Sequence, residues 1–220
     1  MADPYATRTP DLSGRPAGPP PWQGLVADRG GYLVGQAGEI GEEPRFAVIV
    51  CRGIGTLAPF SRLDPALGAL LWVEHTPAAR SAAAANELFA RLRSLEVPCF
   101  GIKHGCVGGP ADRAGCMTIE PALIETVLDA ALQEKVVWET DPDFGYELPA
   151  VVPAVEGDGA RALLPRLLYA DHDRAYEHAE LVAAKKRERA ALAQALSGLE
   201  VAISAASGWP PAPRSGDWRE

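Results

Sequence analysis

A short apolar run followed by a glycine-rich loop contains the residue types best suited to holding an anion. The run, 97–102, is bounded by chain-breaking residues, which is typical of a buried strand. Lys103 and His104 come next and offer a basic pair. Three glycines then permit backbone angles that other residues rarely adopt: Gly105, Gly108 and Gly109. Such a loop can bind an anion through backbone N–H groups, and it can equally be a plain connection, so both interpretations stay open.

The cysteines are the second group of residues that could do chemistry. Cys99, Cys106 and Cys116 lie within one region together with His104, but none shows the close C-x-x-C pairing of structural zinc sites. We therefore predict no metal site. Cys106 could act as a nucleophile activated by His104, although the sequence offers no evident third group to orient the pair. With Cys51, the four cysteines are typical of reduced intracellular thiols.

Strands and helices that could position these residues follow from the apolar pattern. The run 46–51 is continuously apolar, which predicts a strand covered on both faces. Asp64 and Pro65 predict the cap and first turn of a helix that reaches about Trp72. A helix is predicted at 78–95, with Leu88, Phe89 and Leu92 on one side, and a second helix at 121–132. Residues 136–140 are predicted to be extended.

A long helix is predicted from Asp171 to about Ile203. Five of its residues are expected to face the domain: Tyr176, Ala179, Val182, Ala183 and Ala190. The charged run 185–189 is expected to form its solvated face.

Composition limits the class of protein. The formal net charge of -8 argues against a nucleic-acid-binding surface. No apolar stretch is long enough to span a bilayer and the N-terminus does not resemble a signal peptide, so a cytoplasmic protein is expected. Residues 1–24 and 204–220 are expected to be disordered tails rich in proline and glycine, around one domain at 25–203.

The order of several segments resembles one known family. The glycine loop ending in Gly-Gly-Pro110 is followed by Met117-Thr-Ile119, by the predicted helix, and by Glu-Thr-Asp-Pro-Asp-Phe-Gly-Tyr-Glu-Leu-Pro at 139–149. This series resembles the C-terminal part of ATP-dependent phosphoenolpyruvate carboxykinases. Upstream, 46–61 with the following Leu63-Asp-Pro65 resembles the family's strand, turn and helix start. Downstream, 164–166 and 169–176 are similar to its Asn-Pro-Arg and Trp-Ala-Asp segments. The resemblance covers about residues 27 to 196.

The resemblance implies an α/β fold, with a mixed sheet flanked by helices that forms half of a nucleotide-binding domain. Arg29 and Tyr32 resemble the family's Arg-x-x-Tyr step, whose arginine contacts a phosphoryl group or a carboxylate. A guanidinium is well suited to that role because its donors bind an anion bidentately, but a surface arginine beside a glycine turn is the other interpretation. We expect Arg29 and the glycine loop to lie on the same rim of the sheet and to face one shallow pocket.

The sequence also departs from the family. No Gly-x-x-x-x-Gly-Lys-Ser/Thr phosphate loop occurs in it. Arg52 stands where the family has an acidic residue, and Ala114-Gly-Cys116 stands where it has Gly-Lys-Arg. Lys103 and His104 stand where it commonly has Asn-Thr.

Three functions remain open on this basis. The first is a subunit that is non-catalytic alone and binds a partner, a second copy or an anionic ligand such as ATP or another phosphate-bearing molecule. The second is one half of a split carboxykinase or kinase whose phosphate loop comes from another chain. The third is a small enzyme with a new activity that uses Arg29, Lys103 and His104 on an anionic substrate. The sequence identifies no catalytic residue and requires no cofactor.

Overall fold

The computed structural model describes residues 22–34, 44–51, 58–76, 80–103, 105–108 and 116–206. Several predicted features lie outside these ranges, namely most of the N-terminal tail, residues 207–220, Arg52, His104, Gly109 and Ala114.

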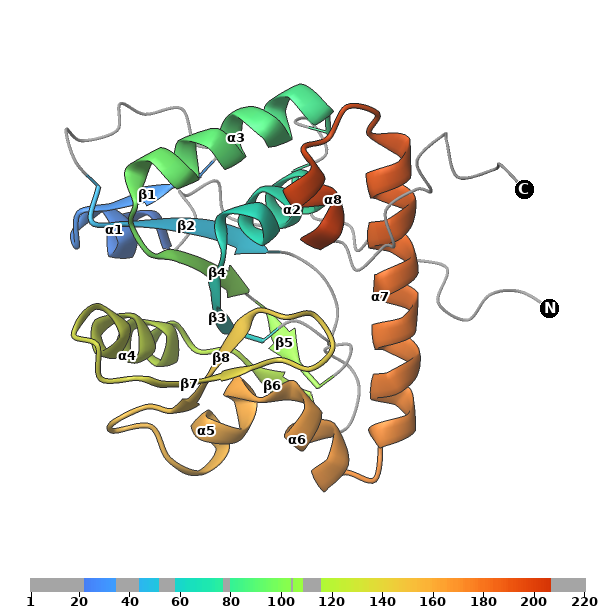
Figure 1. Ribbon diagram of the computed structural model, residues 1–220. Helices are drawn as coiled ribbons and strands as arrows, with labels where there is room; N and C mark the ends of the chain where they lie inside the picture. The colour runs from blue at the N-terminus through green and yellow to red at the C-terminus, as the bar shows by residue number, and fades with distance from the viewer. Residues whose placement is uncertain are drawn as a thin grey trace, which may run out of the picture.

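The described residues form short runs of strands and helices that follow one another along the chain (Figure 1). The strands are β1 (Gly31–Leu33), β2 (Phe46–Cys51), β3 (Phe60–Leu63), β4 (Cys99–Lys103), β5 (Cys106–Val107), β6 (Met117–Thr118), β7 (Val137–Thr140) and β8 (Glu147–Val151). The helices are α1 (Trp22–Ala27), α2 (Pro65–His75), α3 (Ala82–Leu95), α4 (Pro121–Leu132), α5 (Gly157–Leu163), α6 (Pro165–Asp171), α7 (Ala175–Ala195) and α8 (Val201–Ala206). None of these helices combines the length and the apolar character needed to cross a membrane.

Six of the strands form one mixed sheet in the order β1-β2-β4-β3-β8-β7. β1, β2 and β4 are parallel to one another, whereas β3, β8 and β7 each run antiparallel to the strand before them in this order. Where β3 meets β8, Arg62 lies opposite Glu147 and its Nη2 donates to Oε1 at 2.8 Å. β5 and β6 form a separate antiparallel hairpin. The predicted α/β class with a mixed sheet is confirmed.

The sheet has an apolar core on each face, because successive residues of a strand point to opposite sides. In β2, Ala47 and Ile49 belong to the core under α2, α3 and α8, and Phe46 and Val48 belong to the core beside α1, α4, α5 and α6. All four are at most 1% exposed. The prediction of a strand covered on both faces is therefore confirmed.

The helix starts follow local capping chemistry. The Asp64 side chain accepts hydrogen bonds from the backbone N–H groups of Ala66 and Leu67, and Pro65 occupies the first turn of α2, as predicted. α4 has the predicted bounds. Of the helix predicted at 78–95, residues 77–79 lie outside the described ranges and the helix begins at Ala82, where the Ser81 hydroxyl accepts from the Ala84 N–H.

The single helix predicted from Asp171 to Ile203 is divided in the structure. Asp171 ends α6, and α7 and α8 are separated by a turn in which Gly198 has a φ of 88°. Asn86 of α3 holds this turn, since its amide donates to the Gly198 carbonyl and its Oδ1 accepts from the Glu200 N–H. The turn lets Ile203 reach full burial against α2, which a straight helix would not allow.

The predicted inner face of α7 is correct only in part. Val182 and Ala190 are buried, but Ala179 and Ala183 are exposed and Tyr176 is 75% exposed. The predicted solvated run 185–189 contains Arg189, which is 2% exposed. Arg189 is buried because it forms an ion pair with Glu74 of α2.

Candidate functional site

The C-terminal ends of the parallel strands β2 and β4 bring a thiol and a charged side chain together. Cys51 and Lys103, the last residues of the two strands, are partners in the sheet register. In Figure 1 the arrowheads of β2 and β4 point toward α7, which runs past this edge of the sheet. Open α/β sheets typically bind ligands beyond the carboxyl ends of their strands.

Lys103 is a buried cation at this edge. Its side chain is 1% exposed, and its Nζ donates to the Cys106 carbonyl oxygen at 2.6 Å. Burial lowers the pKa of Lys103 to about 8, although attraction to the Cys106, Cys116 and Cys51 sulfurs opposes the shift. Most of its population therefore keeps the positive charge at neutral pH.

The glycine loop has the backbone conformation that its sequence predicts. Gly105 and Gly108 have φ values of 99° and 89°, in the left-handed region that favours glycine. The Gly105 carbonyl accepts from the Ile119 N–H at 2.8 Å, and the Gly108 carbonyl accepts from Arg174 Nη1 at 2.9 Å. β5 thus lies within the loop, between Gly105 and Gly108, and α4 begins only at Pro121. Arg174, at the start of α7, joins Lys103 as a second cation beside the loop.

Arg29 does not share this rim of the sheet, so that prediction is wrong. It precedes β1, whose first residue Gly31 pairs with Phe46 at the start of β2, whereas the glycine loop follows the end of β4. Because these strands are parallel, Arg29 and Gly108 lie at opposite ends of them. The order of the residues along the chain did not reveal this separation.

At its own end of the sheet, Arg29 forms ion pairs with α4. Its Nη2 donates to Glu125 at 2.8 Å and to Asp129 at 3.0 Å. The hydrogen bond that Arg29 donates to Asp129 raises the pKa of Arg29, and desolvation partly offsets this shift. Tyr32, in β1, is half-buried under the Arg91 guanidinium, 5.1 Å from the ring centre. The structure brings neither Arg29 nor Tyr32 to Lys103.

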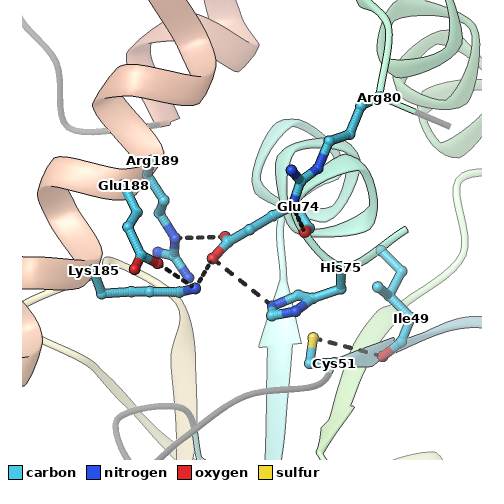
Figure 2. A network of polar contacts seen from close by, with 8 residues as sticks. All are labelled: Ile49, Cys51, Glu74, His75, Arg80, Lys185, Glu188 and Arg189. Carbon is cyan, nitrogen blue, oxygen red and sulfur yellow. Dashed lines mark hydrogen bonds and ion pairs between the residues drawn. The ribbon is translucent and has the colours of Figure 1, made fainter. Parts of the chain in front are cut away.

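A buried ion cluster lies beside the strand ends, between α2 and α7 (Figure 2). We call Glu74, His75, Lys185 and Arg189 the Glu74 cluster. Arg189 Nε donates to Glu74 Oε2 at 2.9 Å, and Lys185 Nζ forms an ion pair with Oε1 of the same carboxylate. His75 Nε2 lies 4.0 Å from Glu74 Oε1. The Glu74 side chain is only 7% exposed, so the cluster is a buried tie between two helices distant in the sequence.

Electrostatics determine which members of the cluster are charged. Burial alone would raise the pKa of Glu74, but Arg189 and Lys185 together lower it below its ordinary value. Burial lowers the pKa of His75 to about 4, because the cost of desolvating an imidazolium exceeds the attraction of Glu74. At neutral pH the cluster therefore holds one carboxylate, a neutral imidazole and two cations. The guanidinium of Arg189 also lies over the Phe144 ring, 4.6 Å from its centre.

Sequence reasoning missed this cluster although the chain carried a signal for it. Val182, Lys185 and Arg189 follow a spacing of three and four residues, which places them on one helix face with a buried valine. Glu74 is an isolated acid at the end of an apolar helix, where a buried carboxylate requires a cationic partner. The charge run at 185–189 hid two inward-facing cations among outward-facing ones.

The cysteines do not come together as metal ligands. Cys99 begins β4 and Cys106 follows its end, so the strand separates them. Among the described residues, no group of three or more histidine, cysteine or acidic side chains could hold a metal ion. Cys106 and Cys116 remain near each other at the hairpin. His104, proposed from the sequence as the base for Cys106, lies outside the described residues.

Comparison with known proteins finds a partial match. The chain is 34% identical over 88 residues to phosphoenolpyruvate carboxykinase (ATP) from Parvibaculum lavamentivorans (strain DS-1 / DSM 13023 / NCIMB 13966). The match covers 39% of this chain and 16% of that relative, well under two thirds of its length. No protein-family model matches the chain. The match supports a distant relationship between this chain and ATP-dependent phosphoenolpyruvate carboxykinases.

Proposed function

We propose that this chain is a phosphoenolpyruvate carboxykinase-like protein that binds a small anionic ligand at the C-terminal ends of β2 and β4. The observation that carries the proposal is Lys103, a buried ammonium group at the end of a parallel strand, with a loop of left-handed glycines directly after it. The ligand class is a nucleotide or a phosphorylated acid. This class follows from the positive charge at the strand ends and from the name of the distant relative.

Lys103 is the group best placed to meet such a ligand. In the Glu74 cluster, Arg189 and Lys185 already face a carboxylate, and Arg174 donates to Glu177 as well as to Gly108. The described hydrogen bond of Lys103 is to a backbone carbonyl, which neutralises no charge. A phosphate or carboxylate near Nζ would therefore gain a charge-assisted hydrogen bond in a region of low dielectric.

We further propose that these 220 residues do not catalyse the carboxykinase reaction by themselves. Phosphoryl transfer requires backbone donors and a lysine around the β- and γ-phosphates together with a bound metal. The sequence contains no Gly-x-x-x-x-Gly-Lys-Ser/Thr motif that would supply the first two. An enzyme completed by a phosphate loop from another chain is the alternative, and a mixture with such a chain would show it by gaining activity.

Association with a second copy or with another subunit is part of the same proposal. β7 is at one edge of the sheet, where Val137 lies opposite Val151. These two side chains are 57% and 58% exposed, which leaves a small apolar surface beside a strand edge that no described strand pairs with. Sedimentation across a wide concentration range tests this part, and a chain that stays monomeric and binds no partner would contradict it.

Ligand-induced stabilisation tests the ligand proposal. Melting temperatures are measured with ATP, ADP, phosphoenolpyruvate and oxaloacetate for the wild type and for Lys103→Met, which keeps the length of the side chain and removes its charge. A ligand at one hundred times its Kd stabilises the folded state by about 2.7 kcal/mol. The wild type should show this with at least one anion, and Lys103→Met should lose it.

Lys135→Met is the matched control, because Lys135 is an exposed lysine whose Nζ donates to Gln133 Oε1 at 2.8 Å. It should respond to the anion as the wild type does. An equal response from Lys103→Met would show that the anion binds elsewhere. Incubation with oxaloacetate, ATP and divalent metal should give no phosphoenolpyruvate above the blank, and metal-dependent turnover by the chain alone would contradict the non-catalytic proposal.

A further inference from the structure

The β5–β6 hairpin places two cysteines on one face. Cys106 lies opposite Thr118 in the antiparallel register, and Cys116 is two residues before Thr118. Residues opposite each other and residues two apart share a face of a hairpin, so Cys106 and Cys116 are diagonal neighbours. Their thiols are hydrogen-bonded to each other.

Exposure separates this pair from the other two cysteines. Cys106 and Cys116 are half-buried, whereas Cys51 and Cys99 are 4% and 3% exposed. Burial raises the pKa of both Cys51 and Cys99 to about 12. A small reagent can therefore reach the hairpin pair and is kept from the other two thiols, whose ionisation is also suppressed.

Lys103 places a buried positive charge beside the pair. Its Nζ lies 2.6 Å from the Cys106 carbonyl oxygen, and both hairpin sulfurs attract its positive charge. Burial raises the pKa of Cys116 to about 12, and its hydrogen bond to Cys106 adds to the shift. Cys116 therefore keeps its proton, and Cys106 is the residue whose carbonyl oxygen accepts from the Lys103 ammonium. Two thiols on one face of a hairpin, beside a buried ammonium, are the arrangement of a reactive dithiol.

We propose that Cys106 and Cys116 form a thiol–disulfide exchange site that takes a low-molecular-weight disulfide of the oxidised glutathione class. The Cys106 thiolate attacks one sulfur of the small disulfide, which forms a mixed disulfide and releases the first small thiolate. The Cys116 thiol then gives its proton to solvent, and its sulfur attacks the Cys106 sulfur and releases the second small thiolate. Two protein thiols become one disulfide, and the small disulfide is reduced to two thiols.

Oxidation of the whole chain under native conditions tests this proposal. The chain is incubated with oxidised glutathione, alkylated, digested with trypsin and analysed by mass spectrometry. Cleavage after Lys103, Arg113 and Lys135 puts the two cysteines on separate peptides, 104–113 and 114–135. The expected result is one cross-linked pair of these peptides, with Cys51 and Cys99 still alkylated as free thiols. The cross-link should disappear on treatment with reduced glutathione.

Variants separate the two steps. Cys116→Ser should stop at a stable mixed disulfide on Cys106, and Cys106→Ser should react much more slowly. Lys103→Met should slow the first step about tenfold, since it removes the charge that favours the thiolate, whereas Lys135→Met should leave the rate unchanged. A wild type that accumulates only the mixed disulfide, or that cross-links Cys51 or Cys99 instead, would overturn the proposal.

Discussion

Neutralising Glu74 should destabilise the protein strongly, because it would leave Arg189 buried without a counter-charge. The substitution Glu74→Gln keeps the size of the side chain and an acceptor oxygen for Arg189 Nε, so it removes only the negative charge. Arg189 is 2% exposed and cannot turn to solvent without leaving the helix interface. Lys185 is 20% exposed and still has Glu188 as a partner at 3.1 Å, so most of the cost falls on Arg189.

The magnitude follows from the burial of the pair. Removing one partner of a buried ion pair costs about 3–5 kcal/mol, whereas an exposed pair contributes about 0–1 kcal/mol. We expect about 3 kcal/mol for Glu74→Gln, because the amide keeps part of the hydrogen bonding. In a chain of this size that loss lowers the melting temperature by roughly 10 °C.

Urea unfolding followed by circular dichroism measures this free energy. Glu188→Gln is the matched control, since it removes the exposed carboxylate, 68% accessible, from the same Lys185, and it should cost less than about 1 kcal/mol. The double variant Glu74→Leu with Arg189→Met should recover most of the stability, because a well-packed apolar pair can replace a buried ion pair. Equal effects of Glu74→Gln and Glu188→Gln, or additive losses in the double variant, would refute the reasoning.

Other substitutions test separate features of the fold. Lowering the pH from 6.5 to 4 should reduce the unfolding free energy of the wild type by up to about 3 kcal/mol more than that of His75→Gln. The reason is that the imidazole of the unfolded chain takes up a proton in this range, whereas folded His75, with a pKa of about 4, does not. Unfolding of the two proteins measured as a function of pH checks this. Gly31→Ala should destabilise by about 1–3 kcal/mol because its Cβ would lie 2.4 Å from the Phe46 ring, whereas Gly24→Ala, with nothing within 4 Å, should be neutral or stabilising by up to about 1 kcal/mol in thermal melts. Asp64→Ala should cost about 1 kcal/mol in the same melts, because it removes the side chain that caps α2.

Helix ends and buried strands were predicted where local chemistry decides them. Asp64 with Pro65 identified the start of α2, and the uninterrupted apolar run identified β2 as a strand covered on both faces. The positive φ values of Gly105 and Gly108 followed from glycine itself. Strand β3 and helices α5 and α6 were not predicted as such, since each is short and gains its stability from neighbours distant in the sequence.

Only the tertiary structure decided which polar residues meet. The sequence placed Arg29 with the glycine loop, but parallel strands put them at opposite ends, because β1 starts where β2 starts and the loop follows the end of β4. It assigned Arg189 to solvent, but α7 turns that face toward Glu74, since a buried carboxylate and buried cations stabilise each other only in contact. The residue types and caps belong to the sequence. Their pairing depends on strand direction and on helix docking, which no local stretch of the chain encodes.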